Sequence, residues 1–91
     1  VLEQNYPNPF NPSTNIQFSI GNRMPVHVVL DIFNVLGQKV RTLVDDYRSQ
    51  GTYRVTWDGK NDAGLSVASG VYFYLLKSNN FVSTKKMLLL K

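Results

Sequence analysis

The sequence has no cysteine, one histidine and one glutamate among its 91 residues. Without cysteine the chain forms no disulfide, no thiolate zinc site and no cysteine nucleophile. A single histidine and a single glutamate are too few for an ordinary zinc site. His27 falls on the polar face of an expected strand, with no nucleophile or orienting carboxylate indicated beside it, so we interpret it as a surface residue. We therefore predict a protein that is not an enzyme, with no catalytic residue, cofactor or metal ligand.

Long apolar runs and gathered charge are also missing. No apolar run approaches the roughly 18 residues of a membrane span, and the run from Met87 to Leu90 has only four. The amino terminus lacks the basic and apolar regions of a signal peptide, so export would require a longer precursor. Ten Lys plus Arg against six Asp plus Glu give a net charge of +4, but the basic residues are scattered along the chain. Neither membrane insertion nor nucleic-acid binding is predicted.

The composition is that of one small folded domain. Hydrophobic residues make up 43% and charged residues 18% of the chain, which excludes a disordered segment. A chain of this length buries about 60–70% of its unfolded surface. That is enough for one core and too little for an enzyme with a separate substrate domain.

The first fifteen residues differ from the rest. Pro7, Pro9 and Pro12 exclude a helix and a central strand there. Tyr6 and Phe10 are large apolar side chains that a free linker would not need. We expect residues 1–15 to form a Pro/Asn-rich opening segment whose two rings pack on a domain formed by residues 16–91.

Alternating apolar and polar residues predict seven short strands and no helix. They are expected near residues 14–20, 26–33, 38–44, 53–57, 65–67, 71–77 and 81–91. Strand 71–77 is apolar on both faces, which predicts a central strand covered on both sides. Short strands at this spacing are typical of an all-β, Ig-like sandwich. The predicted core consists of Ile16, Phe18, Val28, Leu30, Ile32, Tyr53, Val55, Trp57 and Tyr72.

Two clusters invite a chemical interpretation. Asp58, Asn61 and Asp62 suggest calcium, but their spacing is not that of an EF-hand, and side chains that cap their own turn account for them. A weak ion site at 58–62 stays open. Trp57, Tyr72 and Tyr74 form either a sugar-stacking platform or an aromatic core, and alternation favours the core. Tyr72 follows Gly70 by two residues, as in the tyrosine corner of Ig-like sandwiches.

Several blocks together resemble a known family. The chain is similar, in order, to the type A C-terminal sorting domains of the Bacteroidota type IX secretion system. The matching blocks are Leu2–Thr14, Asp31–Gly37 with Val40 and Leu43, Gly51–Asn61, Gly64, Ser69–Phe73 and Lys86–Lys91. The central block is also similar to the Ig-like domain of flagellar hook-capping proteins. The residues taken as the family's structural motif are Tyr6, Pro7, Pro9, Phe10, Trp57, Asp58, Gly59, Gly70 and Tyr72.

The resemblance implies a non-catalytic address label at the carboxyl end of a larger secreted protein. The precursor would cross the inner membrane by its own signal peptide and pass through the periplasm. The outer-membrane type IX machinery would then recognise this domain and bring the upstream cargo to the cell surface or the medium. Cleavage would fall near or before Val1. Two alternatives stay open: an Ig-like structural or assembly module, and an accessory carbohydrate-binding module of a secreted hydrolase.

The end of the chain is where we expect the recognition signal. If the last strand lies at a sheet edge, its main chain offers pairing to a receptor strand, lysines meet acidic groups, and alternate leucines fill pockets. A plain final strand that closes the core is the alternative. The signal residues on this interpretation are Lys85, Lys86, Met87, Leu88, Leu89, Leu90 and Lys91.

Overall fold

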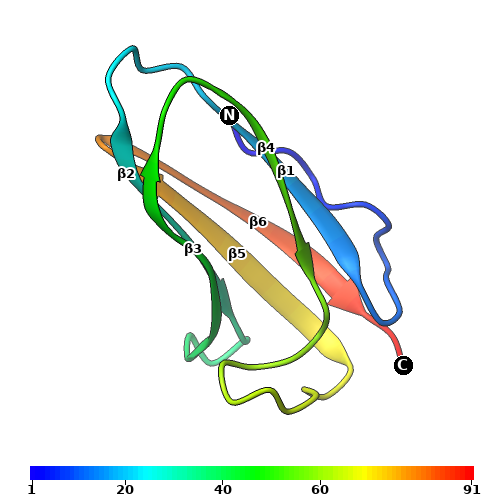
Figure 1. The fold of residues 1–91 in the computed structure, drawn as a ribbon. Coiled ribbons are helices and arrows are strands. Elements are labelled where there is room, and N and C mark those ends of the chain that lie inside the picture. The colour runs from blue at the N-terminus through cyan, green and yellow to red at the C-terminus, as the bar shows by residue number, and fades with distance from the viewer.

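The structure is a computed structural model that describes residues 1–91, and it is entirely β (Figure 1). The all-β prediction is confirmed. No helix in it is long and apolar enough to cross a membrane. Its six strands are β1 (Thr14–Ile20), β2 (Val26–Phe33), β3 (Lys39–Arg48), β4 (Gly51–Trp57), β5 (Gly70–Ser78) and β6 (Phe81–Leu89).

The predicted count of seven strands is wrong, because residues 65–67 form no strand. One isolated bridge between Lys60 and Ser66 is the only ladder contact there. Leu65 is exposed, and only Val67 of this stretch packs against the core. Strand β3 is also longer than predicted, since Asp45 to Arg48, expected as a connection, pair with the first half of β2.

The strands form two antiparallel sheets that face each other (Figure 1). The small sheet pairs β1 with β4, and the large sheet has the order β3-β2-β5-β6. Strand β5 is central, as predicted, but only one of its faces is covered. Tyr72, Tyr74 and Leu76 are buried between the sheets, whereas Val71 and Phe73 on the other face are half-buried. The expectation of a strand covered on both sides is therefore wrong, because no element of this chain packs on the outer face of the large sheet.

The opening segment forms isolated bridges to both sheets. Its first residues run antiparallel to β1, where the Glu3 N–H donates to the Gln17 carbonyl (2.9 Å). Tyr6 and Asn15 then exchange main-chain bonds of 3.0 and 2.9 Å. Further on, Phe10 forms a parallel bridge with Leu89 at the end of β6. The segment thus leaves the edge of the small sheet and joins the edge of the large one.

The two termini lie at opposite ends of the sandwich (Figure 1). Val1 exchanges main-chain bonds with Ser19 at the end of β1. Lys91 donates its N–H to the Ser69 hydroxyl, just before β5 begins. The molecule measures 40 × 22 × 20 Å, so its long axis separates the two chain ends.

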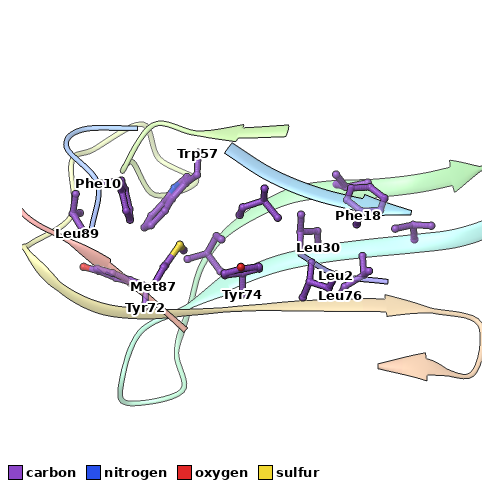
Figure 2. Close-up of a cluster of buried hydrophobic side chains, with 14 of the residues drawn as sticks. Leu2, Phe10, Phe18, Leu30, Trp57, Tyr72, Tyr74, Leu76, Met87 and Leu89 are labelled. Atoms are coloured by element: carbon purple, nitrogen blue, oxygen red, sulfur yellow. The ribbon is translucent and has the colours of Figure 1, made fainter. Parts of the chain in front are cut away.

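The inner faces of both sheets supply one core (Figure 2). Seven of the nine predicted core residues are buried, and the other two, Tyr53 and Val55, are half-buried at the margin of the small sheet. Core residues absent from the predicted set come from the opening segment, β1 and the large sheet. They are Leu2, Phe10, Ile20, Val44, Tyr74, Leu76, Met87 and Leu89.

Trp57 lies at the centre of an aromatic group between the sheets (Figure 2). Its ring centroid is 5.6 Å from that of Phe10 and 5.3 Å from that of Tyr72, the latter in an edge-on arrangement. The indole N–H donates to the Lys60 carbonyl at 2.9 Å. Three separate parts of the chain therefore meet on this one side chain.

Replacing Trp57 with alanine should destabilise the domain by about 3–5 kcal/mol, because a fully buried ring leaves a cavity. Denaturant unfolding measures the change. Leu65→Ala is the control, since that side chain is exposed and its truncation should change the free energy of unfolding by only about 0.5 kcal/mol or less. Equal stability of the Trp57 variant and the wild type would contradict the packing described above.

Candidate recognition surface

The predicted signal at the chain end is divided by the fold. Strand β6 is an edge strand, paired on one side only with β5. Met87 and Leu89 point into the core and are buried, so they are not free to fill the pockets of a receptor. Lys85 and Leu88 are half-buried, and Lys86, Leu90 and Lys91 are exposed. The exposed part of the predicted signal thus consists of two lysines and one leucine.

The opening segment occupies the outer edge of the last part of β6. The Leu88 N–H donates to Asn8 Oδ1 (3.0 Å), and the Leu88 carbonyl accepts from the Phe10 N–H (3.0 Å). The Leu90 N–H donates to the Phe10 carbonyl at 3.0 Å. Gln4 Nε2 donates to the Lys86 carbonyl at 2.8 Å. Pairing of a receptor strand along the whole terminal strand, as the sequence predicts, is therefore blocked between Lys86 and Leu90.

Tyr74 of β5 holds the opening segment from beneath. Its hydroxyl donates to the Glu3 carbonyl and accepts the Asn5 N–H, both at 2.8 Å. Asn5 is buried, and its Nδ2 donates to the Thr14 hydroxyl (2.9 Å), which in turn donates to the Pro7 carbonyl (2.8 Å). The pKa of Tyr74 is raised to about 12, chiefly because the hydroxyl is buried; the bond from the Asn5 N–H opposes this rise, and the Glu3 charge adds to it.

The two aromatic rings of the opening segment point in opposite directions. Phe10 is buried beside Trp57, whereas Tyr6 is 79% exposed, so the expectation that both rings pack is wrong for Tyr6. Leu2 bridges Phe18 and Tyr6 bridges Asn15, which is a shift of one residue in register. A one-residue shift turns the following side chains to the other face of a sheet. Tyr6 therefore shares the outer face with Asn15, and Pro7 and Pro9 are exposed beside it.

The tyrosine corner predicted at Tyr72 is confirmed, and a second one occurs at Tyr53. The Tyr72 hydroxyl donates to the Ala68 carbonyl (2.7 Å) and the Tyr53 hydroxyl to the Ser49 carbonyl (2.6 Å). In both, a glycine two residues earlier has a positive φ, 150° at Gly70 and 155° at Gly51. Such a φ favours glycine. The Gly-x-Tyr spacing at 51–53 is the signal that would have revealed the second corner.

The 58–62 loop uses its oxygens within the chain. Asp58 Oδ1 accepts the Lys60 N–H at 3.1 Å, and Asn61 Oδ1 accepts two main-chain N–H groups. Arg41 Nη1 lies 3.2 Å from Asp58, and Asp62 Oδ1 accepts the Thr42 N–H. No three His, Asp or Glu side chains are grouped closely enough to hold a metal ion. These are the turn caps that the sequence favours over an ion site.

Gly59 in this loop is close to the opening segment. It has a φ of 74°, and a Cβ built there would lie 3.1 Å from the Pro12 carbonyl oxygen. Glycine therefore permits both the turn and the approach of the two loops. The rings proposed for a sugar platform, Trp57, Tyr72 and Tyr74, are all buried, so that platform does not exist. His27 is exposed, with Nε2 2.6 Å from Asp45 Oδ1.

Two facing antiparallel sheets with a tyrosine corner define an Ig-like β-sandwich. The family model of the FlgD Ig-like domain matches residues 8–80, and the chain belongs to that family. The match stops before β6. No curated protein matches the sequence.

Two solved structures from Porphyromonas gingivalis share the fold. A crystal structure of dimeric latent PorU superposes with a TM-score of 0.76 at 20% identity, over 98% of this chain and 9% of that one. PorZ, described as an essential bacterial surface component of the type-IX secretion system, gives a TM-score of 0.67 at 17% identity, over 97% of this chain and 11% of that one. This chain therefore corresponds to about a tenth of each protein. Unlike the family match, both superpositions extend over nearly all of it.

Phe10→Ala should destabilise the domain by about 3–5 kcal/mol, because the ring fills the space beside Trp57. Tyr6→Ala should change the free energy of unfolding by about 0.5 kcal/mol or less, since that ring is exposed. Denaturant unfolding of both variants provides the comparison. A larger loss for Tyr6→Ala than for Phe10→Ala would contradict the placement of the two rings.

The raised pKa of Tyr74 makes stability depend on alkaline pH. The folded state holds this proton more tightly than the unfolded chain, whose tyrosine pKa is about 10, while the folded pKa is about 12. The stabilisation is therefore complete below pH 10 and is lost as the pH rises through 12. Denaturant unfolding at a series of pH values should show a steeper alkaline loss for the wild type than for Tyr74→Phe. Tyr74→Phe should be less stable at neutral pH, because the Glu3 carbonyl and the Asn5 N–H lose their partner. Parallel alkaline curves would contradict the assignment.

Proposed function

We propose that this domain is a non-catalytic sorting domain of the type IX secretion system. An upstream cargo in the same precursor would be carried across the periplasm and through the outer membrane to the cell surface. The sequence blocks of the sorting domains support this role. The likeness of the fold to PorZ, a surface component of that system, gives independent support.

The observation that carries the proposal is the seam between the two ends of the chain. The blocks at 2–14 and 86–91 resemble the sorting domains, and β6 lies wholly outside the FlgD Ig-like match. In the structure these distant blocks are joined by the bonds from Gln4, Asn8 and Phe10 to Lys86, Leu88 and Leu90. Beside these bonds, Lys86 is exposed within β6, and Leu90 and Lys91 are exposed where the chain leaves the strand. A receptor that binds this surface would contact the block at 2–14 and the block at 86–91 together.

An Ig-like structural or assembly module is the second candidate, and the FlgD Ig-like family match favours it. The carbohydrate-binding alternative loses its basis, because the rings on which it rested are in the core. The two remaining functions differ in what they demand of the chain end. An assembly module does not require Lys86 and Leu90 for export of its cargo, whereas a sorting domain does.

The test is secretion of a reporter fused ahead of the whole domain in a host with the type IX system. Lys86→Ala together with Leu90→Ala should lower the exported reporter roughly tenfold or more, as expected when interface anchors are truncated. Both side chains are exposed, so the melting temperature should stay near that of the wild type. Wild-type export by this variant would refute the sorting role of the chain end.

The matched control replaces Leu36 and Lys39 with alanine; both are also exposed, Leu36 in the turn before β3 and Lys39 as the first residue of β3. This control variant should be exported like the wild type. Deleting Met87 to Lys91 is a poor test, because it removes Met87 and Leu89 from the core and the partner of Phe10 from the seam. Loss of export after that deletion would report unfolding.

A further inference from the structure

The net charge of the chain is carried by its last third. Residues 1–62 contain six Lys or Arg and six Asp or Glu, so their formal charge is zero. Residues 63–91 contain four lysines and no acidic residue, so they carry all of the +4. These residues form β5, β6 and their flanks. The basic residues are scattered along the whole sequence, but all of the acidic residues lie at or before residue 62. The positive charge of the β5–β6 hairpin is therefore not balanced by acidic residues of the same hairpin.

The first half of β6 has an unpaired main-chain edge. The Leu88 N–H and carbonyl point away from β5 toward the opening segment, as do the Lys86 carbonyl and the Leu90 N–H. Main-chain groups alternate in direction along an antiparallel strand. The N–H and carbonyl groups of Val82 and Thr84 therefore also point outward, and neither residue has a hydrogen-bond partner on that side. The opening segment bonds to this edge from the Lys86 carbonyl onward and leaves the main-chain groups of Val82 and Thr84 and the Lys86 N–H without a partner.

The side chains along this free edge are basic and apolar. Lys86 is exposed on the outer face, and Lys85 is half-buried on the inner face. Lys77 is paired with Val82 across the hairpin. Val82 is 61% exposed. An added strand would thus meet lysines on both faces and one exposed apolar side chain.

We infer that the free edge of β6 from Val82 to Lys86 binds an extended strand of a partner that carries acidic side chains. Main-chain bonds would supply affinity by strand addition, and Lys85 and Lys86 would select the acidic sequence. A second copy of this chain does not fit, because pairing two such edges would bring together two hairpins of +3 each. This inference rests on the proposed function in that it names the chemistry of the receptor.

The first experiment measures binding of a synthetic ten-residue peptide of alternating glutamate and valine to the whole 91-residue chain. A peptide with lysine in place of glutamate is the comparison. Binding should be seen for the acidic peptide alone and should weaken between about 0.1 M and 1 M salt, where the Debye length falls from about 10 Å to 3 Å. Amide exchange should slow at the Val82 and Thr84 N–H groups when the acidic peptide is present. No protection at these two amides would overturn the inference.

Proline variants test the main chain separately from the charge. Thr84→Pro removes one outward N–H, and an edge strand tolerates proline where the N–H faces solvent. It should weaken binding of the acidic peptide roughly tenfold, as expected when a partner group is left unpaired. Thr56→Pro is the matched control. The main-chain groups of the odd-numbered residues of β1 bond to the opening segment, so those of its even-numbered residues bond to β4. Thr56 lies opposite Asn15, an odd-numbered residue, so the Thr56 N–H faces away from β1. That variant should bind like the wild type.

Charge variants complete the test. Lys85→Glu with Lys86→Glu should abolish binding of the acidic peptide, whereas Lys39→Glu with Lys60→Glu, both exposed and outside the hairpin, should retain most of it. If vesicles containing an anionic lipid bind with the same lysine dependence but Thr84→Pro has no effect, the hairpin is a lipid-binding surface and strand addition is wrong. Peptide binding requires no secretion host. Normal peptide binding with unaffected export of the Lys86/Leu90 variant would therefore refute the proposed function alone.

Discussion

The main-chain contact between Phe10 and the end of β6 is the constraint on which the rest of the arrangement depends. Two hydrogen bonds of 3.0 Å place Phe10 beside Leu88 and Leu90. That position sets the Phe10 ring against Trp57, which in turn contacts Tyr72. Because the first residues of the same segment pair with β1, a single stretch of backbone is hydrogen-bonded to both sheets, whose own strands do not pair with each other. The contact of Phe10 with Leu88 and Leu90 thus fixes both the aromatic part of the core and the position of the chain end.

Local sequence patterns account for much of the fold. Alternation in 14–20 and 26–33 identifies two strands within their observed bounds, because one face of each lies on the core. The burial of Trp57 and Tyr72 is predicted by the same alternation of apolar and polar residues. The corner at Tyr72 is readable from Gly70, since a glycine at that position permits the bend that brings the hydroxyl back to the chain.

Where the sequence predicts burial or strand pairing wrongly, the outcome depends on partners that are distant in sequence. The sequence predicts that Tyr6 packs inside, but the face on which its ring lies is decided by a shift in register against β1, which no local pattern encodes. Leu65 to Val67 have strand-like composition without a neighbouring strand to pair with. In the terminal block, burial of Met87 and Leu89 depends on which side of β6 meets the other sheet. The covering of its edge depends on a segment some eighty residues earlier. Sequence indicated where the candidate site lies, and only the fold showed which part of it is free.

The separation of the two chain ends has a consequence for how such a domain can be handled. A protein joined ahead of Val1 would leave the sandwich at the end of β1, while Leu90 and Lys91 face solvent near the opposite end of a body 40 Å long. A receptor that binds the carboxyl-terminal end would not clash with a protein attached at the amino-terminal end. The domain would then act as a spacer, and binding of the receptor would not depend on the size and shape of the attached protein.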